Sequence, residues 1–202
     1  MIVAYTGVPG GGKSVHAAQD ISDGLRFKDQ LVISNVPINL DYFSGRKKKK
    51  SPFLYIPNNE LDPNEIIKLA KTYYQYRKFS ESGVLLVLDE AQLIFNSRSW
   101  YEKSRKDWVY LMTNSRHFGI KVIIITQMLE MLDKQIRGCI EIEYIHRNMA
   151  NFGWLGKIIS VLVGGKLFVV VGRYLGLRQQ ISSQYVFGRR HLYKLYDSYA
   201  TM

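Results

Sequence analysis

Residues 7–14 have the sequence Gly-Val-Pro-Gly-Gly-Gly-Lys-Ser, and this octapeptide is the strongest indication of the fold. It matches G-x-x-x-x-G-K-[ST], the pattern of the phosphate-binding P-loop, or Walker A motif. An apolar stretch at residues 2–5 precedes it and a helical pattern over residues 13–27 follows it, which is the context that the motif requires. The non-functional alternative is a glycine-rich turn that is followed by an incidental lysine. The candidate nucleotide-binding residues are Gly7, Val8, Pro9, Gly10, Gly11, Gly12, Lys13 and Ser14.

The chemistry of phosphate binding explains the residue types in this loop. Glycines let the backbone curl so that successive N–H groups point inward at an anion. The helix that follows adds the positive end of its dipole. Lys13 is expected to reach the β- and γ-phosphates, and the Ser14 hydroxyl is expected to ligate magnesium. The loop therefore predicts a nucleoside triphosphate and Mg²⁺ as ligands.

A second apolar run, residues 84–88, ends in the acidic pair Asp89 and Glu90. A P-loop protein needs such a carboxylate at the end of a buried strand to hold magnesium, and Asp89 would do so through water. Glu90 could polarise the attacking water as general base. The alternative for Glu90 is a carboxylate that merely favours the dipole of a helix start.

A third apolar run, residues 122–126, ends in Gln127. If this strand lies beside the P-loop strand, Gln127 points at the γ-phosphate and can sense whether it is present. The alternative is a polar residue that caps the strand and faces water. Because the chain has no Asn-Lys-x-Asp guanine signature, ATP is the expected nucleotide.

Alternating strands and helices predict an α/β fold with a mainly parallel central sheet. Continuous rather than alternating apolarity suits strands that are buried on both faces. One helix has a clear start signal, with Asp62 as N-cap, Pro63 at the first helical position and Glu65 closing a capping box. The predicted strands are residues 2–5, 31–36, 84–88 and 122–126, and the predicted helices are residues 13–27, 62–76 and 101–116.

The sequence pattern changes after residue 141. Residues 167–171 and 181–187 predict strands that extend the sheet or form a hairpin, and residues 189–199 predict a terminal amphipathic helix. We interpret the apolar run 158–171 as two strands around a Gly-Gly turn. The expected organisation is one domain over residues 1–202, with a core at about 1–147 and a C-terminal extension at about 148–202.

Composition bounds the class of protein. The 202 residues are 47% apolar and 22% charged, as in globular proteins. The one cysteine, Cys139, excludes an intramolecular disulfide and a cysteine-rich zinc site. The net charge of +11 attracts phosphate, either in nucleic acid or in lipid headgroups. A transmembrane helix needs about 20 apolar residues, and we find no such run, so we expect a soluble chain.

Several segments resemble the zonular occludens toxin family, which includes the gene I assembly proteins of filamentous bacteriophages. The segment around Arg98, Ser99 and Trp100 is more specific than either Walker motif. The other matching segments are residues 86–90, Arg116, Gln127, residues 132–137 and residues 192–197.

The resemblance implies an ATPase domain at the cytoplasmic face of the bacterial host inner membrane that powers phage extrusion. It implies phage coat proteins, and phage single-stranded DNA or its binding protein, as partners. It also implies a RecA-like fold related to the FtsK and HerA motors, and hence a homo-oligomeric ring. Family members continue into a transmembrane helix and a periplasmic segment, so we interpret this chain as the cytoplasmic part.

A ring ATPase usually completes its active site with an arginine from the neighbouring subunit. Arg98, Arg116 and Arg137 match family positions, and we favour Arg137 and then Arg98 as this arginine finger. For each of them, an ordinary salt bridge is the alternative. The predicted catalytic residues are therefore Glu90, Lys13, Gln127, Arg137 and Arg98.

A basic cluster, an aromatic cluster and two histidines are further candidates for binding or catalysis. The basic run at residues 46–50 could bind DNA phosphate or lipid headgroups, or form a solvated loop. The aromatic cluster at residues 73–79 could stack bases, although packing of a helix side under the sheet is favoured. His16 and His117 look like ordinary helix residues, to which we assign neither metal nor catalysis.

The sequence thus predicts a magnesium-dependent ATPase that acts as the motor domain of a phage assembly protein. Two alternatives from other classes stay open. One is a non-hydrolytic switch, in which ATP binding alone drives assembly. The other is a basic nucleic-acid or lipid-binding module whose P-loop is secondary.

Overall fold

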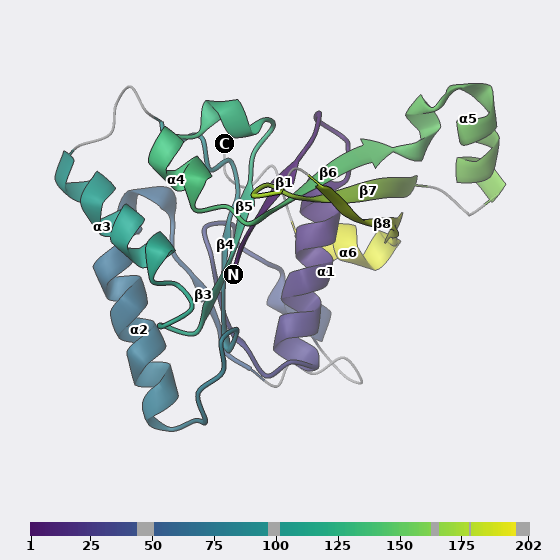
Figure 1. Ribbon diagram of the computed structural model, residues 1–202. Helices are drawn as coiled ribbons and strands as arrows, with labels where there is room; N and C mark the ends of the chain where they lie inside the picture. The colour runs from purple at the N-terminus through teal and green to yellow at the C-terminus, as the bar shows by residue number, and fades with distance from the viewer. Residues whose placement is uncertain (44–50, 97–101, 163–165, 178, 197–202) are drawn as a thin grey trace.

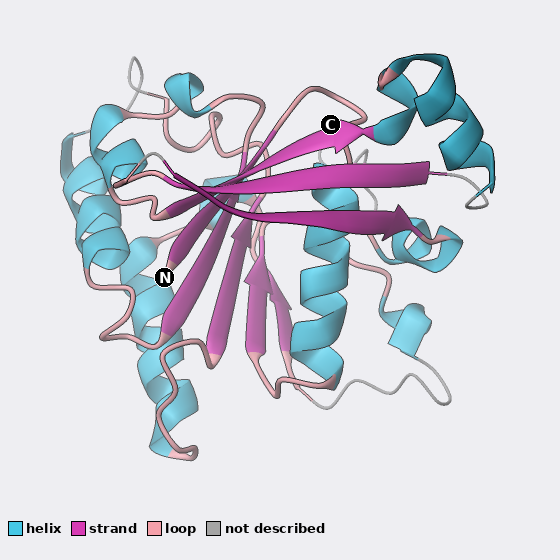
Figure 2. Ribbon diagram, turned by 45° about the vertical axis from the view of Figure 1, so that its right-hand side comes forward, coloured by secondary structure: helices cyan, strands magenta, loops and turns pink. Residues whose placement is uncertain are grey.

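The computed structural model describes residues 1–43, 51–96, 102–162, 166–177 and 179–196, and within them the strands form one eight-stranded sheet (Figures 1 and 2). The strand order is β3-β2-β4-β5-β1-β6-β7-β8. The strands from β1 to β6 pair in parallel, whereas β7 pairs antiparallel with β6 and with β8. Their bounds are β1 Ile2–Thr6, β2 Leu31–Ser34, β3 Phe53–Tyr55, β4 Val84–Leu88, β5 Ile120–Ile125, β6 Ile142–Asn148, β7 Lys166–Tyr174 and β8 Gln179–Gly188.

Helices cover both faces of the sheet. Figure 1 shows α1 and α6 on one face and α2, α3 and α4 on the other, while α5 stands beyond the end of β6. Because successive residues of a strand point to opposite faces, the sheet has an apolar core on each face. Val3 belongs to the core on the α1 side, with Ile21, and Ala4 belongs to the core on the other side, with Trp108 of α3. The helices are α1 Lys13–Arg26, α2 Pro63–Gln75, α3 Glu102–Thr113, α4 Lys134–Gly138, α5 Gly153–Leu162 and α6 Arg190–Leu195.

The predicted α/β fold with a mainly parallel sheet is confirmed. All four predicted core strands are present, with ends that differ from the prediction by one or two residues. The two predicted C-terminal strands form the β7–β8 hairpin and also extend the sheet. Two strands were missed: β3 is only three residues long, and β6 is so polar that its sequence lacks the continuous apolar pattern.

The interpretation of residues 158–171 as two strands around a turn is wrong in its first half, because residues 158–162 belong to α5. The strands β6 and β7 pair directly with one another, with Asn148 opposite Phe168. The residues between them lie past the end of the sheet, where no neighbouring strand offers backbone partners. A helix satisfies its own backbone groups there, and this outweighs the β-branched residues of the segment.

Other helix predictions hold with shorter bounds. The Asp62 carboxylate accepts a hydrogen bond of 2.8 Å from the Asn64 N–H, and Pro63 opens α2, as the start signal predicts. The third helix ends at Thr113 rather than at residue 116, so His117 lies in a turn. The terminal helix is α6, which ends at Leu195, and the last six residues lie outside the described part.

The favoured interpretation of the aromatic cluster, packing of a helix side under the sheet, holds for Tyr73 and Tyr74, which pack against the core. Tyr76 and Phe79 are exposed. The Tyr73 hydroxyl donates to the Asp29 carbonyl at 2.7 Å, and the Tyr74 hydroxyl donates to the Gly119 carbonyl at 2.9 Å. The basic run at residues 46–50 lies outside the described residues. No helix in the described part of the chain has the length and apolar character to span a membrane.

Candidate nucleotide site

The phosphate loop joins β1 to α1 at the carboxyl end of the parallel strands. Gly7, Gly10 and Gly12 have φ values of +133°, +74° and +102°, a region that side-chain-bearing residues rarely adopt. The Gly7 N–H donates to the Gln127 carbonyl at 3.1 Å, which ties the start of the loop to the end of β5. The three glycines thus supply the curled backbone that the motif predicts.

Lys13 is folded back over this loop. Its Nζ donates to the carbonyl of Gly7 at 2.7 Å and to that of Val8 at 3.3 Å. Burial lowers the pKa of Lys13, and the negative charges of Asp89 and Glu90 oppose that shift. The ammonium therefore lies within electrostatic reach of both predicted carboxylates. Val8 and Pro9 are exposed at the loop tip, and their contribution to nucleotide binding stays a prediction.

Asp89 directly follows β4 and is buried, with 7% of its surface exposed. Asn35, after β2, clamps its backbone: the Asn35 Oδ1 accepts from the Asp89 N–H at 2.7 Å, and the Asn35 Nδ2 donates to the Asp89 carbonyl at 2.8 Å. The carboxylate Oδ1 accepts from the Glu90 N–H at 2.8 Å. Burial raises the pKa of Asp89, because desolvation penalises its charged form.

Tyr196 is a site residue that the sequence analysis missed. It follows α6, is buried, and donates its hydroxyl to the Asp89 Oδ2 at 2.7 Å. An antiparallel bridge with Ile38 and a 2.9 Å hydrogen bond from the Asn39 N–H to the Leu195 carbonyl hold the segment in place. The segment 192–197, which resembles the family, includes Tyr196, but no local pattern indicates its contact with Asp89, because the two partners are 107 positions apart.

Replacing Tyr196 by Phe is expected to lower the free energy of unfolding by about 1.5–3 kcal/mol, the net value of a hydrogen bond to a charged group. The change removes one hydroxyl and leaves a buried carboxylate without that donor. Urea unfolding at pH 7 measures the effect. Tyr76→Phe is the control, because Tyr76 is 86% exposed. Equal unfolding midpoints for the two variants would contradict a contribution of this bond to stability.

Glu90 has a φ of +48°, which is unusual for a residue with a side chain. Such strained positions concentrate at functional sites. Its side chain is exposed and accepts a hydrogen bond from the Gln92 Nε2. The Thr126 hydroxyl in turn donates to the Gln92 Oε1 at 3.0 Å, which links Glu90 to the end of β5. The general-base role of Glu90 stays a prediction.

Gln127 lies where the sensor hypothesis requires it. The strand β5 pairs with β1 on one side and with β4 on the other. Gln127 therefore follows a strand between the phosphate loop and the Asp89–Glu90 pair, and its side chain is exposed. The adjacency of the two strands is confirmed, while the sensing of a γ-phosphate stays a prediction.

The residues of this site fit a magnesium ion. A small hard cation takes oxygen ligands and is commonly held by one or two carboxylates with phosphates and waters. Asp89 is a buried carboxylate at the end of β4, and a bound cation would favour its charged form against the desolvation that raises its pKa. Among the described residues no cluster of three or more His, Cys, Asp or Glu could form a dedicated metal cage. Ser14 and Asp89 remain the predicted protein ligands.

The candidate arginine fingers have different surroundings. Arg116 forms an ion pair with Glu141, which matches the salt-bridge alternative. Arg137 is partly buried in the last turn of α4. Arg98 lies outside the described residues. The assignment of an arginine finger to Arg137 or Arg98 stays a prediction.

A histidine pair beneath the loop was also missed, because His146 lies on the unpredicted strand β6. The His146 Nδ1 lies 2.8 Å from the Tyr144 carbonyl and therefore carries a proton. Its Nε2 then accepts from the His16 Nδ1 at 2.9 Å. Burial, followed by the neighbouring His16, lowers the pKa of His146 to about 3. Burial also lowers the pKa of His16, so the two histidines lie beneath the loop as neutral side chains.

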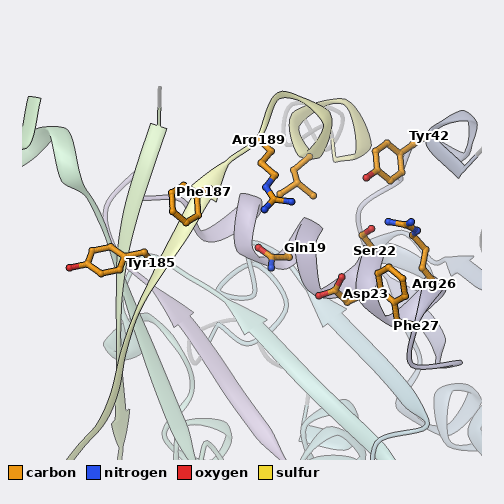
Figure 3. Close-up of a pocket in the computed structure, with 10 residues that line it drawn as sticks. Gln19, Ser22, Asp23, Arg26, Phe27, Tyr42, Tyr185, Phe187 and Arg189 are labelled. Carbon is orange, nitrogen blue, oxygen red and sulfur yellow. The ribbon is translucent and has the colours of Figure 1, made fainter. Parts of the chain in front are cut away.

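A cavity of about 260 Å³ lies between α1 and β8, away from the loop (Figure 3). Asp23 and Arg26 come from α1, Phe187 comes from the end of β8, and Arg189 lies between β8 and α6. None of the described residues that were predicted for the nucleotide site lines this cavity. It is therefore separate from the chemistry of the phosphate loop.

Comparison with known proteins places the whole chain in one family. The sequence model of the family described as "Zonular occludens toxin (Zot)" matches residues 1–202. The Gene 1 protein of Salmonella phage IKe is 33% identical over an alignment of 172 residues that covers 82% of this chain and 46% of that protein. The Gene 1 protein of Escherichia phage If1 is 28% identical over an alignment, gaps included, of 209 residues that covers 98% of this chain and 58% of that protein. The chain spans about half the length of these curated relatives.

Solved structures share the fold at low sequence identity. The N-terminal domain of zonular occludens toxin from Neisseria meningitidis has a TM-score of 0.56 at 16% identity, covering 97% of this chain and 98% of that chain. The genome packaging NTPase of Sulfolobus turreted icosahedral virus 2, in complex with AMP, has a TM-score of 0.59 at 16% identity, covering 92% and 98%. These similarities show a P-loop NTPase fold.

Proposed function

This chain belongs to the zonular occludens toxin family, and from that premise we propose that it is an ATP-hydrolysing motor domain for the assembly and extrusion of a filamentous phage at the host inner membrane. The similarity to Gene 1 proteins of filamentous phages supports the biological setting. The fold shared with a genome packaging NTPase supports a motor that acts on a viral particle.

The observation that carries the proposal is the convergence of two motifs at one edge of the parallel sheet. The strand β5 pairs with β1, which leads into the loop of Lys13, and with β4, which leads into Asp89 and Glu90. These residues come from two separate motifs, and the fold brings them to one edge of the sheet. A cation that binds phosphate, a carboxylate suited to magnesium and a second carboxylate suited to water activation are the parts that phosphoryl transfer to water requires.

Each residue then has a defined task. The backbone N–H groups from Gly10 to Ser14 bind the phosphates, and Lys13 leaves its two carbonyl partners to neutralise the β- and γ-phosphate oxygens. Ser14 and Asp89 would hold Mg²⁺, which supplies positive charge at the phosphates when it is bound. Glu90 takes the proton of the attacking water, and Gln127 contacts the γ-phosphate.

The wider setting is part of the same proposal. We place the domain at the cytoplasmic face of the inner membrane, as a homo-oligomeric ring in which a neighbour's arginine completes the site. Phage coat proteins, and phage single-stranded DNA or its binding protein, are the proposed partners. The net charge of +11 supports contact with a polyanion, whether DNA or lipid headgroups.

Replacing Lys13 by Ala is expected to weaken ATP binding about 10- to 100-fold, because the phosphates lose charge-assisted hydrogen bonds worth roughly 1.5–3 kcal/mol. Isothermal titration calorimetry with MgATP measures the affinity. Lys68→Ala is the matched control, since Lys68 is an exposed lysine on α2 that pairs only at the surface with Glu65.

The basic-module alternative makes the opposite prediction. If the P-loop were secondary, ATP affinity would be equal in Lys13→Ala and Lys68→Ala, and salt-dependent binding of DNA or anionic vesicles would survive both changes. That pair of results would contradict the proposed nucleotide site.

A further inference from the structure

A cavity of about 390 Å³ opens directly beside the phosphate loop, within the size range of small-molecule sites. One wall is the loop and first turn of α1, from Gly10 to Val15. The other wall comes from the C-terminal part of the chain. It consists of Asn148 at the end of β6, Lys166 and Phe168 at the start of β7, and Tyr193 in α6.

Phe168 fixes the distance between the two walls. It is buried, with 2% of its surface exposed. A Cβ atom on Gly12 would lie 2.4 Å from the Phe168 Cγ, so the glycine backbone sits directly against the ring. The strand β7 therefore packs on the phosphate loop itself, and the cavity is continuous with the place where phosphates are expected.

Tyr193 is the aromatic side chain that faces this cavity with an accessible ring. It is 40% exposed, and the Lys166 Nζ lies 4.9 Å from its ring centroid. A Cβ atom on Gly188 would lie 2.6 Å from the Tyr193 hydroxyl and 2.8 Å from the Lys166 Cβ. The absence of a side chain at Gly188 thus lets the tyrosine and the lysine pack together.

Two polar side chains of the C-terminal wall, Asn148 and Lys166, can donate hydrogen bonds into the cavity. The Asn148 Oδ1 already accepts from the Ala150 N–H at 3.0 Å, which orients the amide and leaves its N–H groups as donors toward a ligand. The Lys166 ammonium is a donor with no acceptor capacity. A purine offers ring-nitrogen acceptors and a flat face for stacking, so its chemistry complements these side chains.

We propose that this cavity receives the base and ribose of the nucleotide whose phosphates the loop binds, with Tyr193 as the stacking wall for the base and with Lys166 and Asn148 as donors to it. The inference rests on the proposed function and adds the site of the base. It assigns the selection of a nucleoside, rather than of bare phosphate, to the C-terminal strands and α6. The P-loop core then supplies the phosphate chemistry alone.

The test compares MgATP with inorganic tripolyphosphate, which has the phosphates without the base, by isothermal titration of the 202-residue chain. The wild type is expected to bind MgATP more tightly than tripolyphosphate. Tyr193→Leu is expected to weaken MgATP binding about 5- to 100-fold, the range measured for loss of a base–aromatic stack. Its tripolyphosphate affinity should stay at the wild-type value. Tyr193→Phe should retain MgATP affinity, because the ring is kept.

Tyr76→Leu controls for loss of an exposed tyrosine, and Lys166→Met gives a second, independent reduction in MgATP affinity should Tyr193→Leu fail to fold. The proposed base site would be refuted if Tyr193→Leu bound MgATP with wild-type affinity. If that variant is unfolded, wild-type affinity in Lys166→Met would refute it instead. An equal loss for MgATP and tripolyphosphate would also overturn it, since the tyrosine would then act on the loop. Either result leaves the proposed function standing as long as Lys13→Ala weakens MgATP binding by about the expected 10- to 100-fold. MgATP binding that is absent, or indifferent to Lys13, would refute both.

Discussion

Replacing Glu90 by Gln is expected to lower the rate of ATP turnover by about 10²- to 10⁴-fold, the contribution of a positioned general base. The amide keeps the shape of the side chain but takes no proton from the attacking water. The affinity for MgATP should stay at the wild-type value, because the base acts after the nucleotide has bound. Steady-state phosphate release, measured across a series of protein concentrations, gives the turnover of both proteins.

Glu65→Gln is the matched control, because Glu65 is an exposed glutamate at the first turn of α2. A specific activity that rises with protein concentration in the wild type would support a site shared between subunits. Turnover that is equal in wild type and Glu90→Gln would contradict the general-base role. If both rates were negligible while MgATP still bound, the non-hydrolytic switch would be the better description.

Replacing Gly7 by Ala is expected to destabilise the fold by roughly 2–5 kcal/mol, from overpacking together with an unfavourable φ. A Cβ atom at this position would lie 2.4 Å from the carbonyl oxygen of His146, and that oxygen belongs to the backbone of β6. The φ of +133° adds strain for any side chain. Urea unfolding, followed by circular dichroism, measures the loss.

Gly10→Ala measures the cost of a positive φ without a close contact, so comparison with Gly7→Ala shows the effect of packing. Gly10 also has a positive φ, of +74°, but its Cβ atom would meet nothing within 4 Å. The expected loss for Gly10→Ala is therefore only about 1–2 kcal/mol, the cost of a left-handed residue. Equal losses in the two variants would show that the close approach of β6 does not constrain the loop.

Local sequence patterns were sufficient to predict the phosphate loop as a candidate site and to locate most strands of the core. The P-loop needs a local run of residue types, because its anion nest is built from consecutive backbone N–H groups. Continuous apolar runs likewise predict the buried strands, and the N-cap residue Asp62 predicts the start of α2. Lys13, Asp89 and Glu90 could be selected for the same reason, since each stands at a fixed place in a short motif.

The surroundings of these groups could be read only from the folded chain. The donor to Asp89 is Tyr196, and the residue beneath Gly7 is His146, each more than 100 positions away in the chain. The strand β6 is too polar for its sequence to show the apolar pattern of a buried strand. The helix α5 forms because its residues lie past the end of the sheet, where they cannot pair with a neighbouring strand. Such contacts depend on which strands become neighbours, and strand order is set by packing of the whole sheet rather than by any short stretch of sequence.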